Sequence, residues 1–203
     1  MCSSDLNEMN QWGVAMRALT VIGLSAALIC CAPETPQGAR VANAEEACRA
    51  EAKAEWTTPS GPMRLHAAAS GPTCGQSAAS LVIRSEAGDA LYASIYPVNT
   101  LYGFETASTA PAMQAALTAW IDPGGSPMRT TTDLPPWRPG AEQPESGEFP
   151  FFPSEQYAEP TAYEQLRTQA LPIYCYPQGR ESLSCLVLRD ETLEPVGLQT
   201  FPG

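Results

Sequence analysis

The chain has 203 residues, with 22 Asp or Glu, 11 Lys or Arg and a formal net charge of −11 at pH 7. This acidic balance, without a cluster of basic residues, argues against nucleic acid as a partner. With 44% hydrophobic residues the chain can bury a core. Its length fits one domain behind a processed N-terminus better than two domains.

A basic residue followed by an apolar run near the N-terminus predicts an export signal. Arg17 precedes a largely apolar, uncharged stretch over 18–32, ALTVIGLSAALICCA, and Pro33 follows it. A signal peptide has a positive start, about 7–15 apolar residues and small residues near its end. The alternative, a permanent membrane helix, requires about 20 apolar residues, and extending the run to that length would bury Arg17.

The residues before this signal do not resemble a signal start. Residues 1–15 contain two acids and no basic residue. We interpret them as a non-native extension, with translation beginning at Met16 or Met9. The predicted organisation is an extension over 1–15, a signal peptide over 16–30, a tether over 31–43 and a single domain over 44–203.

The end of the apolar run, Leu28-Ile29-Cys30-Cys31, resembles the lipobox of bacterial lipoproteins. In that family an aliphatic residue and two mostly small residues precede a cysteine that is acylated and becomes the first residue. The resemblance implies lipidation of Cys31. In the same family the following residue influences sorting, and Ala32 implies the outer membrane, with the protein facing the periplasm.

Cleavage by ordinary signal peptidase is the alternative route. Ala42-Asn43-Ala44 forms an A-x-A pattern before Glu45, and twelve residues separate Ala32 from Glu45. That distance is longer than the polar region normally found before such a cut. This route would give a soluble periplasmic or secreted protein.

The cysteines beyond the signal predict two disulfides. Cys48, Cys74, Cys175 and Cys185 make an even number, which in an exported domain is typical of disulfides. Their spacing contains no CxxC pair, so we expect no zinc site, and no motif suggests another cofactor. Cys175 and Cys185 lie at roughly equal distances from a turn at Arg180 and could pair across a hairpin, leaving Cys48 with Cys74. The other two connectivities stay open.

The first half of the domain is predicted to contain one helix and three strands. Cys48, Ala52 and Trp56 recur every fourth residue after a cap-like start, which predicts a helix over 44–56. Alternation over 63–67, with Met63, Leu65 and Ala67 facing the core, predicts a strand. Two further strands are predicted over 79–85 and 90–96, joined by a turn.

The second half is predicted to contain two helices and a three-strand meander. Met113, Leu117, Trp120 and Ile121 form an apolar stripe, which predicts a helix over 109–121. A short helix follows over 160–169, and the strands are predicted over 171–176, 183–189 and 196–201. The expected fold class is α+β, an antiparallel sheet of two hairpin or meander units packed with two or three short helices and held by disulfides.

Patterns typical of catalysis fail in this sequence. Gly75-Gln76-Ser77-Ala78-Ala79 is close to a nucleophile elbow, but a strand is predicted after it instead of a helix, and the only His lies upstream. A thiol pair of Cys74 and His66 is a weak option, because Cys74 is more simply a disulfide partner and His66 alternates onto the solvated face. The sequence does not show which two carboxylates a hydrolase would use. We therefore assign no catalytic residue.

Aromatic residues in a long Pro- and Glu-rich loop over 130–157 form the first candidate binding site. Their rings either fix the loop onto the sheet or anchor a partner, with an arginine supplying hydrogen bonds. The hairpin over 174–181 is a second candidate, as an exposed tip. The partner-binding residues predicted for the loop are Trp137, Arg138, Phe151, Phe152 and Tyr157.

The combined patterns predict a lipid-anchored protein of the cell envelope. We expect a non-enzymatic binding, inhibitory or structural module, attached to the membrane through its lipid and contacting an envelope protein or glycan. The alternative is a small envelope hydrolase that acts through carboxylates.

Overall fold

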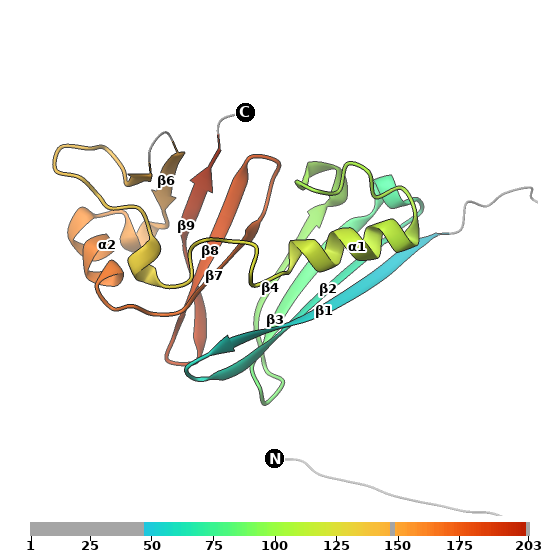
Figure 1. Ribbon diagram of the computed structural model, residues 1–203, viewed down its shortest axis with the longest axis horizontal. Helices are drawn as coiled ribbons and strands as arrows, with labels where there is room; N and C mark the ends of the chain where they lie inside the picture. Colours follow the sequence, from blue (N-terminus) through green and yellow to red (C-terminus); the bar gives the residue numbers. More distant parts are fainter. Residues whose placement is uncertain (1–46, 147–148, 202–203) are drawn as a thin grey trace, which may run out of the picture. The chain divides into compact units, whose positions relative to one another are not determined.

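The structure is a computed structural model that describes residues 47–146 and 149–201. The extension, the signal peptide, the lipidation site Cys31 and the tether lie outside the described residues. The described part contains two antiparallel sheets, two α-helices and two disulfides (Figure 1). This confirms the mixed α+β class, with strands predominating, although the strands form two sheets.

The first sheet contains four strands in the order of the chain. They are β1 (Cys48–Thr58), β2 (Gly61–Gly71), β3 (Ala78–Arg84) and β4 (Ala90–Pro97). The three predicted strands correspond to β2, β3 and β4. Met63, Leu65 and Ala67 are buried, which confirms the predicted alternation in β2.

The predicted helix over 44–56 is wrong, because residues 48–56 lie in β1. A spacing of four residues is compatible with a helix face, but it is also twice the strand period of two. Cys48, Ala52 and Trp56 are buried, whereas the odd-numbered residues from Arg49 to Glu55 are exposed. The alternation of small or apolar residues with charged ones was therefore the informative pattern.

The second sheet has five strands in the order β5-β6-β9-β8-β7. The predicted meander corresponds to β7 (Ile173–Pro177), β8 (Ser182–Arg189) and β9 (Thr192–Thr200). The predicted loop over 130–157 is corrected, because it contributes β5 (Glu145–Ser146) and β6 (Phe149–Pro153). β6 pairs with β9 through Phe151 opposite Gln199, which extends the sheet beyond the meander.

The helix α1 (Ala110–Trp120) begins where the sequence predicted. The Thr109 side chain accepts a hydrogen bond from the backbone N–H of Ala112 at 3.3 Å, which satisfies one of the free donors of the first turn. Met113 and Leu117 are fully buried against the first sheet. The predicted apolar stripe is therefore confirmed.

The helix α2 (Pro160–Arg167) belongs to the second sheet. It begins with a proline, which has a fixed φ and needs no hydrogen-bond acceptor in the first turn. Tyr163 and Leu166 are fully buried. They pack with Phe151 and Val196 in a second core on the outer side of this sheet.

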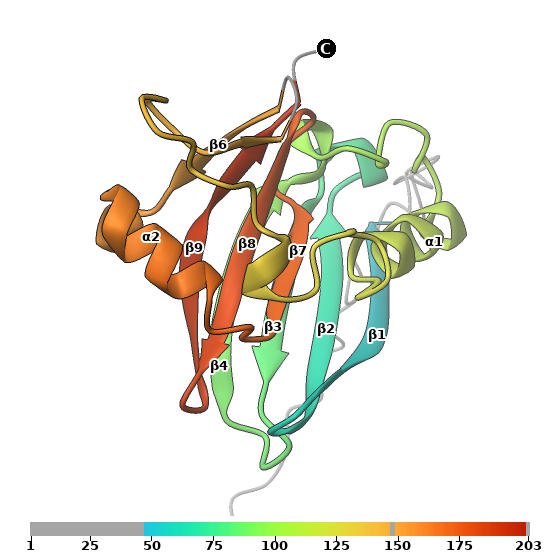
Figure 2. The same ribbon diagram turned by 60° about the vertical axis from the view of Figure 1, so that its left-hand side comes forward.

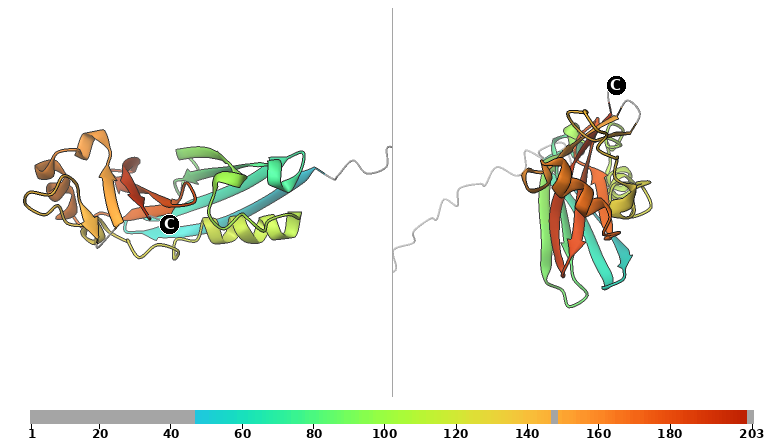
Figure 3. Two further views of the ribbon diagram at one scale, coloured as in Figure 1. Left: turned by 90° about the horizontal axis from the view of Figure 1, so that it is seen from above. Right: turned by 90° about the vertical axis from the view of Figure 1, so that its left-hand side faces the viewer.

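The two sheets and α1 share the first core. α1 and the second sheet lie side by side along the first sheet (Figure 3), and α2 lies across β8 and β9 (Figure 2). Residues of β7, β8 and β9 join the buried face of the first sheet in one apolar cluster. The described residues contain no helix long and apolar enough to cross a membrane.

A group of tyrosines on β4 and β7 links the two sheets. The Tyr176 Oη lies 2.6 Å from the Tyr92 Oη and 2.9 Å from the Tyr96 Oη. On the same strand, the ring of Tyr174 lies 5.7 Å from that of Trp56 on β1. Burial raises the pKa of the Tyr176 hydroxyl above its ordinary range, with the hydrogen bonds to its neighbours as a smaller cause. This hydroxyl group is therefore kept neutral in the folded protein.

Both predicted disulfides are present. Cys175 and Cys185 lie directly opposite each other in β7 and β8. Cys48 is bonded to Cys74, which precedes β3. Because Cys48 begins a strand, this bond fixes the start of β1 to the turn before β3.

The raised pKa of Tyr176 predicts that stability declines in alkali. Above pH 10.0, the ordinary value, the unfolded chain loses a proton that the folded chain keeps, so the free energy of unfolding falls as pH rises. Below that pH this contribution is constant. Tyr176→Phe should lower the free energy of unfolding by about 1–2 kcal/mol at pH 8. Between pH 10 and 11, the free energy of unfolding of this variant should decline less than that of the wild type. Urea unfolding at each pH measures both effects.

Tyr102→Phe is the matched control, because the Tyr102 side chain is exposed. It should reproduce the alkaline decline of the wild type. Equal declines in the wild type and in Tyr176→Phe would contradict the assignment.

Candidate functional site

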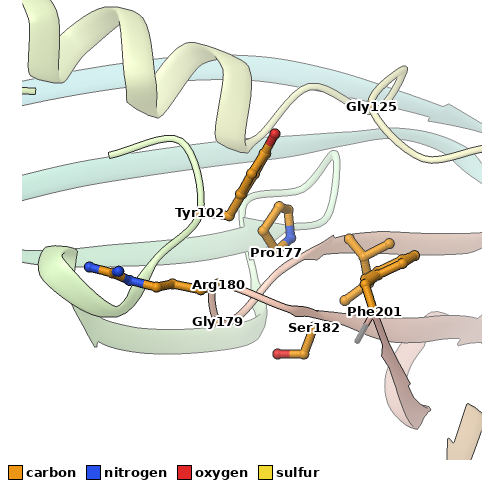
Figure 4. A pocket seen from close by; sticks show the side chains of 8 residues that line it. Tyr102, Gly125, Pro177, Gly179, Arg180, Ser182 and Phe201 are labelled. Carbon is orange, nitrogen blue, oxygen red and sulfur yellow. The ribbon is translucent and has the colours of Figure 1, made fainter. Parts of the chain in front are cut away.

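A groove opens between the turn that follows β4 and the tip of the β7–β8 hairpin (Figure 4). It consists of two hollows of about 380 and 200 Å³ that share Tyr102, Gly125, Pro177 and Leu183. We call it the Tyr102 groove. Its larger hollow adds Gly179, Arg180, Ser182 and Phe201, and its smaller one adds Ala116, Ala119, Trp120 and Asp122, among others.

The backbone on both sides of Tyr102 forces its ring outward. Leu101 and Phe104 are buried in the first core and hold the turn against the sheet. Gly103 has a φ of 85°, which glycine adopts readily and which lets the chain reverse at this point. The Tyr102 side chain is consequently 65% exposed, at the rim of the groove.

Hydrogen bonds fix the hairpin tip against the neighbouring elements. The Tyr102 N–H donates to the Gly179 carbonyl at 3.2 Å, and Arg180 Nη2 donates to the Asn99 carbonyl at 3.0 Å. Trp120 Nε1 donates to the Pro177 carbonyl at 2.6 Å. The two walls of the groove are thus connected before any ligand arrives, which lowers the entropy cost of binding.

The charges of the groove lie in different hollows. Arg180 is exposed beside the larger hollow, and Asp122 lines the smaller one. The Asp122 Oδ1 accepts a hydrogen bond from the Gly124 N–H at 2.8 Å, so this carboxylate also stabilises the turn after α1. The surface between the two charges is formed by aromatic, aliphatic and proline side chains.

The five residues predicted as one partner-binding surface are not brought together on a surface. Phe151 and Tyr157 are buried in the second core, with exposures of 0% and 8%. Phe152 is 45% exposed, because successive strand residues point to opposite faces. Arg138 is exposed, and Trp137 is half-buried. The expectation of a single surface is therefore wrong for the two buried rings.

Trp137 instead holds the segment before β5 onto α2. Its Nε1 donates to the Ala141 carbonyl at 3.0 Å, and its backbone N–H donates to the Glu164 Oε1 at 2.8 Å. Its ring meets that of Tyr163 edge to face at 5.8 Å. These contacts correspond to the interpretation in which the rings attach the loop to the sheet.

The two possible nucleophile arrangements, Ser77 in an elbow and Cys74 with His66, are not formed. Ser77 follows a short turn and precedes β3, and its Oγ donates to the Thr73 carbonyl at 2.8 Å. Cys74 is in a disulfide, so a thiol pair with His66 is not formed. His66 lies on the outer face of the first sheet, where its Nε2 is 3.3 Å from the Glu51 Oε2.

One carboxyl group among the described residues has a clearly shifted pKa. The backbone N–H groups of Arg129 and Thr130 donate to Asp133 and hold its pKa below the ordinary value. A carboxylate kept ionised in this way caps a turn and is unsuited to act as a general acid. Within residues 47–146 and 149–201, no three metal-ligating side chains gather.

Tyr102 was missed by sequence reasoning, whereas the hairpin tip was named as the second candidate. The detectable signal was a tyrosine between Leu101 and Gly103, in a segment to which no strand or helix had been assigned. No protein-family model, curated protein or solved structure matches this chain.

The role of Trp137 predicts a loss of stability on truncation. Trp137→Ala removes the contact with Tyr163 and the hydrogen bond to Ala141, and it should lower the free energy of unfolding by about 2–4 kcal/mol. Phe152→Ala, at an exposed ring of the same region, should cost less than about 1 kcal/mol. Urea unfolding compares the two. Unchanged stability of Trp137→Ala with loss of a bound partner would contradict this role.

Proposed function

We propose that this protein is a lipid-anchored binding module of the cell envelope, attached through Cys31 and recognising its partner with the Tyr102 groove. The observation that carries the binding role is an exposed aromatic ring above a preformed apolar groove. Buried or half-buried aromatic anchors and arginine dominate binding energies at protein interfaces. The groove offers Tyr102 and Arg180 together.

The disulfides support export. All four cysteines within the described residues are paired, Cys48 with Cys74 and Cys175 with Cys185. Disulfides persist in the periplasm and outside the cell and are rare in the cytosol. Together with the signal-like N-terminus, this favours an envelope location. The lipobox-like Cys31 favours a lipid anchor, and Ala32 after it favours the outer membrane.

The lining of the groove favours binding or inhibition over hydrolysis. A glycosidase needs two carboxyl groups on either side of the reacting bond. Asp122 is the one carboxylate among the described residues that line the Tyr102 groove, and its Oδ1 accepts a hydrogen bond from the Gly124 N–H. The groove therefore provides contacts for holding a ligand, without a pair of acids placed to cleave it.

Lipidation at Cys31 predicts a specific N-terminal peptide. In a bacterial host, the membrane-extracted protein should begin with a diacylglyceryl-modified Cys31, as measured by mass spectrometry. Cys31→Ser should abolish the diacylglyceryl modification and the start at residue 31, as measured by mass spectrometry. Cys30→Ser is the matched control and should remain lipidated. An unmodified start at Glu45 would contradict the anchor and leave a soluble envelope protein.

The binding role predicts that a partner contacts position 102. A photo-activatable benzoylphenylalanine at Tyr102 should cross-link one or a few envelope components in cells. The same residue at Ile95 should not, because Ile95 is similarly exposed, at 69%, but lies outside the groove. Equal cross-linking at both positions, or none at position 102, would contradict a binding role for the groove.

A further inference from the structure

We infer that the ligand of the Tyr102 groove is an extended, proline-rich peptide segment of a partner protein, with a carboxylate of that segment beside Arg180. This inference rests on the proposed binding function and names its ligand class. It is carried by the hydrogen-bonding state of the groove lining, by its apolar surface and by its charge.

Three backbone acceptors of the hairpin tip each already accept one hydrogen bond. The carbonyls of Pro177, Gly179 and Ser182 accept hydrogen bonds from Trp120 Nε1, the Tyr102 N–H and the Gln178 N–H, respectively. A ligand rich in N–H or O–H donors would therefore have to share these carbonyls with the hydrogen bonds that they already accept. An unpaired buried donor costs about 1–3 kcal/mol.

Donors, in contrast, remain available. The hydroxyls of Tyr102 and Ser182 have no partner within the described residues, and Arg180 uses one Nη2 bond to the Asn99 carbonyl. A guanidinium has five N–H donors, so others are free for a ligand. The larger hollow thus combines free donors with carbonyls that each hold one hydrogen bond, and the Asp122 carboxylate lies in the smaller hollow.

A polyproline II segment has the complementary pattern. Its carbonyl groups make no internal hydrogen bonds, and each proline lacks a backbone N–H. Such a segment accepts hydrogen bonds from the groove and has few donors that need an acceptor. Aromatic-lined grooves are the surfaces that recognise this conformation in proteins.

The apolar surface of the groove suits proline rings. In Figure 4 the Tyr102 and Phe201 rings lie on either side of Pro177, and Leu183 adds an aliphatic side chain to the lining. The two hollows that share Tyr102 give successive positions along the groove. A polyproline segment also starts with little conformational freedom, which reduces the entropy lost on binding.

A glycan fits these observations less well. Each sugar carries several hydroxyl groups that act as donors, and these would have to share the carbonyls of Pro177 and Gly179 with Trp120 Nε1 and the Tyr102 N–H. The same objection applies to an ordinary β-strand, whose backbone N–H groups would need acceptors. The lining therefore favours proline over both.

Arg180 selects the charge of the ligand. The chain has a net charge of −11, so an acidic peptide is repelled by the protein as a whole and is attracted locally by this guanidinium. A carboxylate forms short, charge-assisted hydrogen bonds with arginine. We therefore place an acidic residue of the peptide at this end of the groove.

The test measures binding of fluorescein-labelled peptides to the full-length protein by fluorescence polarisation. The probe is a peptide of five prolines followed by glutamate. One comparison peptide ends in glutamine, and a second has alternate prolines replaced by alanine, which restores N–H donors. We expect saturable binding of the probe, about fivefold weaker binding of the glutamine peptide and at least about fivefold weaker binding of the alanine peptide.

Three variants locate the site. Tyr102→Ala should weaken binding of the probe at least about tenfold, whereas Ile95→Ala, at an equally exposed position outside the groove, should change it less than about twofold. Arg180→Gln should remove the preference for glutamate over glutamine. Arg180→Lys should retain part of that preference, because it keeps the charge. Thermal unfolding verifies that each variant is folded.

Each other outcome overturns the inference. Absence of saturable binding, or binding that is insensitive to Tyr102→Ala, excludes this ligand class for the groove. If a tetramer of N-acetylglucosamine binds in a Tyr102-dependent way and the peptides do not, the groove function stands and its ligand is a glycan. If cross-linking at position 102 also fails, the proposed function itself is wrong.

Discussion

The packing of β7 against the first sheet is the interaction on which the rest of the structure depends. Tyr174 and Tyr176 point from this strand into the first core and meet residues of β1 and β4, the two opposite edges of that sheet. The Tyr176 hydroxyl is paired with those of Tyr92 and Tyr96 across the interface, whereas the buried Tyr174 hydroxyl has no hydrogen-bond partner among the described residues. The hairpin tip then lies beside Tyr102, so the groove is a consequence of how the sheets meet.

The disulfides act on different parts of this arrangement. Cys175–Cys185 crosses the hairpin behind the tip, whereas Cys48–Cys74 fixes the start of β1 to the turn before β3. Their sequence separations are 10 and 26 residues. In the chain-entropy model the second bond restricts the unfolded chain more, since it closes the longer loop. One bond stiffens the site, and the other mainly stabilises the sheet.

Local patterns in the sequence were sufficient to predict some helices and strands and insufficient to predict others. α1 was predictable because Thr109 is a good cap and the buried residues follow a helical period that a strand does not share. β1 was not, because a spacing of four residues from Cys48 to Trp56 suits both structures when the intervening charges are ignored. The strand β6 was hidden by its prolines, and its pairing with β9 depends on residues over forty positions away. The groove was the hardest to foresee, because Tyr102 and the hairpin tip meet only through the packing of the two sheets.

The charged residues of β1 affect how this edge strand can pair with a second molecule. This strand is an edge of the first sheet and is eleven residues long, which exposes a row of unpaired backbone groups. Along its outer face Arg49, Glu51, Lys53 and Glu55 alternate in sign. A second copy that paired with this edge in a parallel, in-register arrangement would place each of these charges beside a like charge. For a protein concentrated in two dimensions by the proposed anchor, this pattern disfavours parallel, in-register joining of neighbouring sheets.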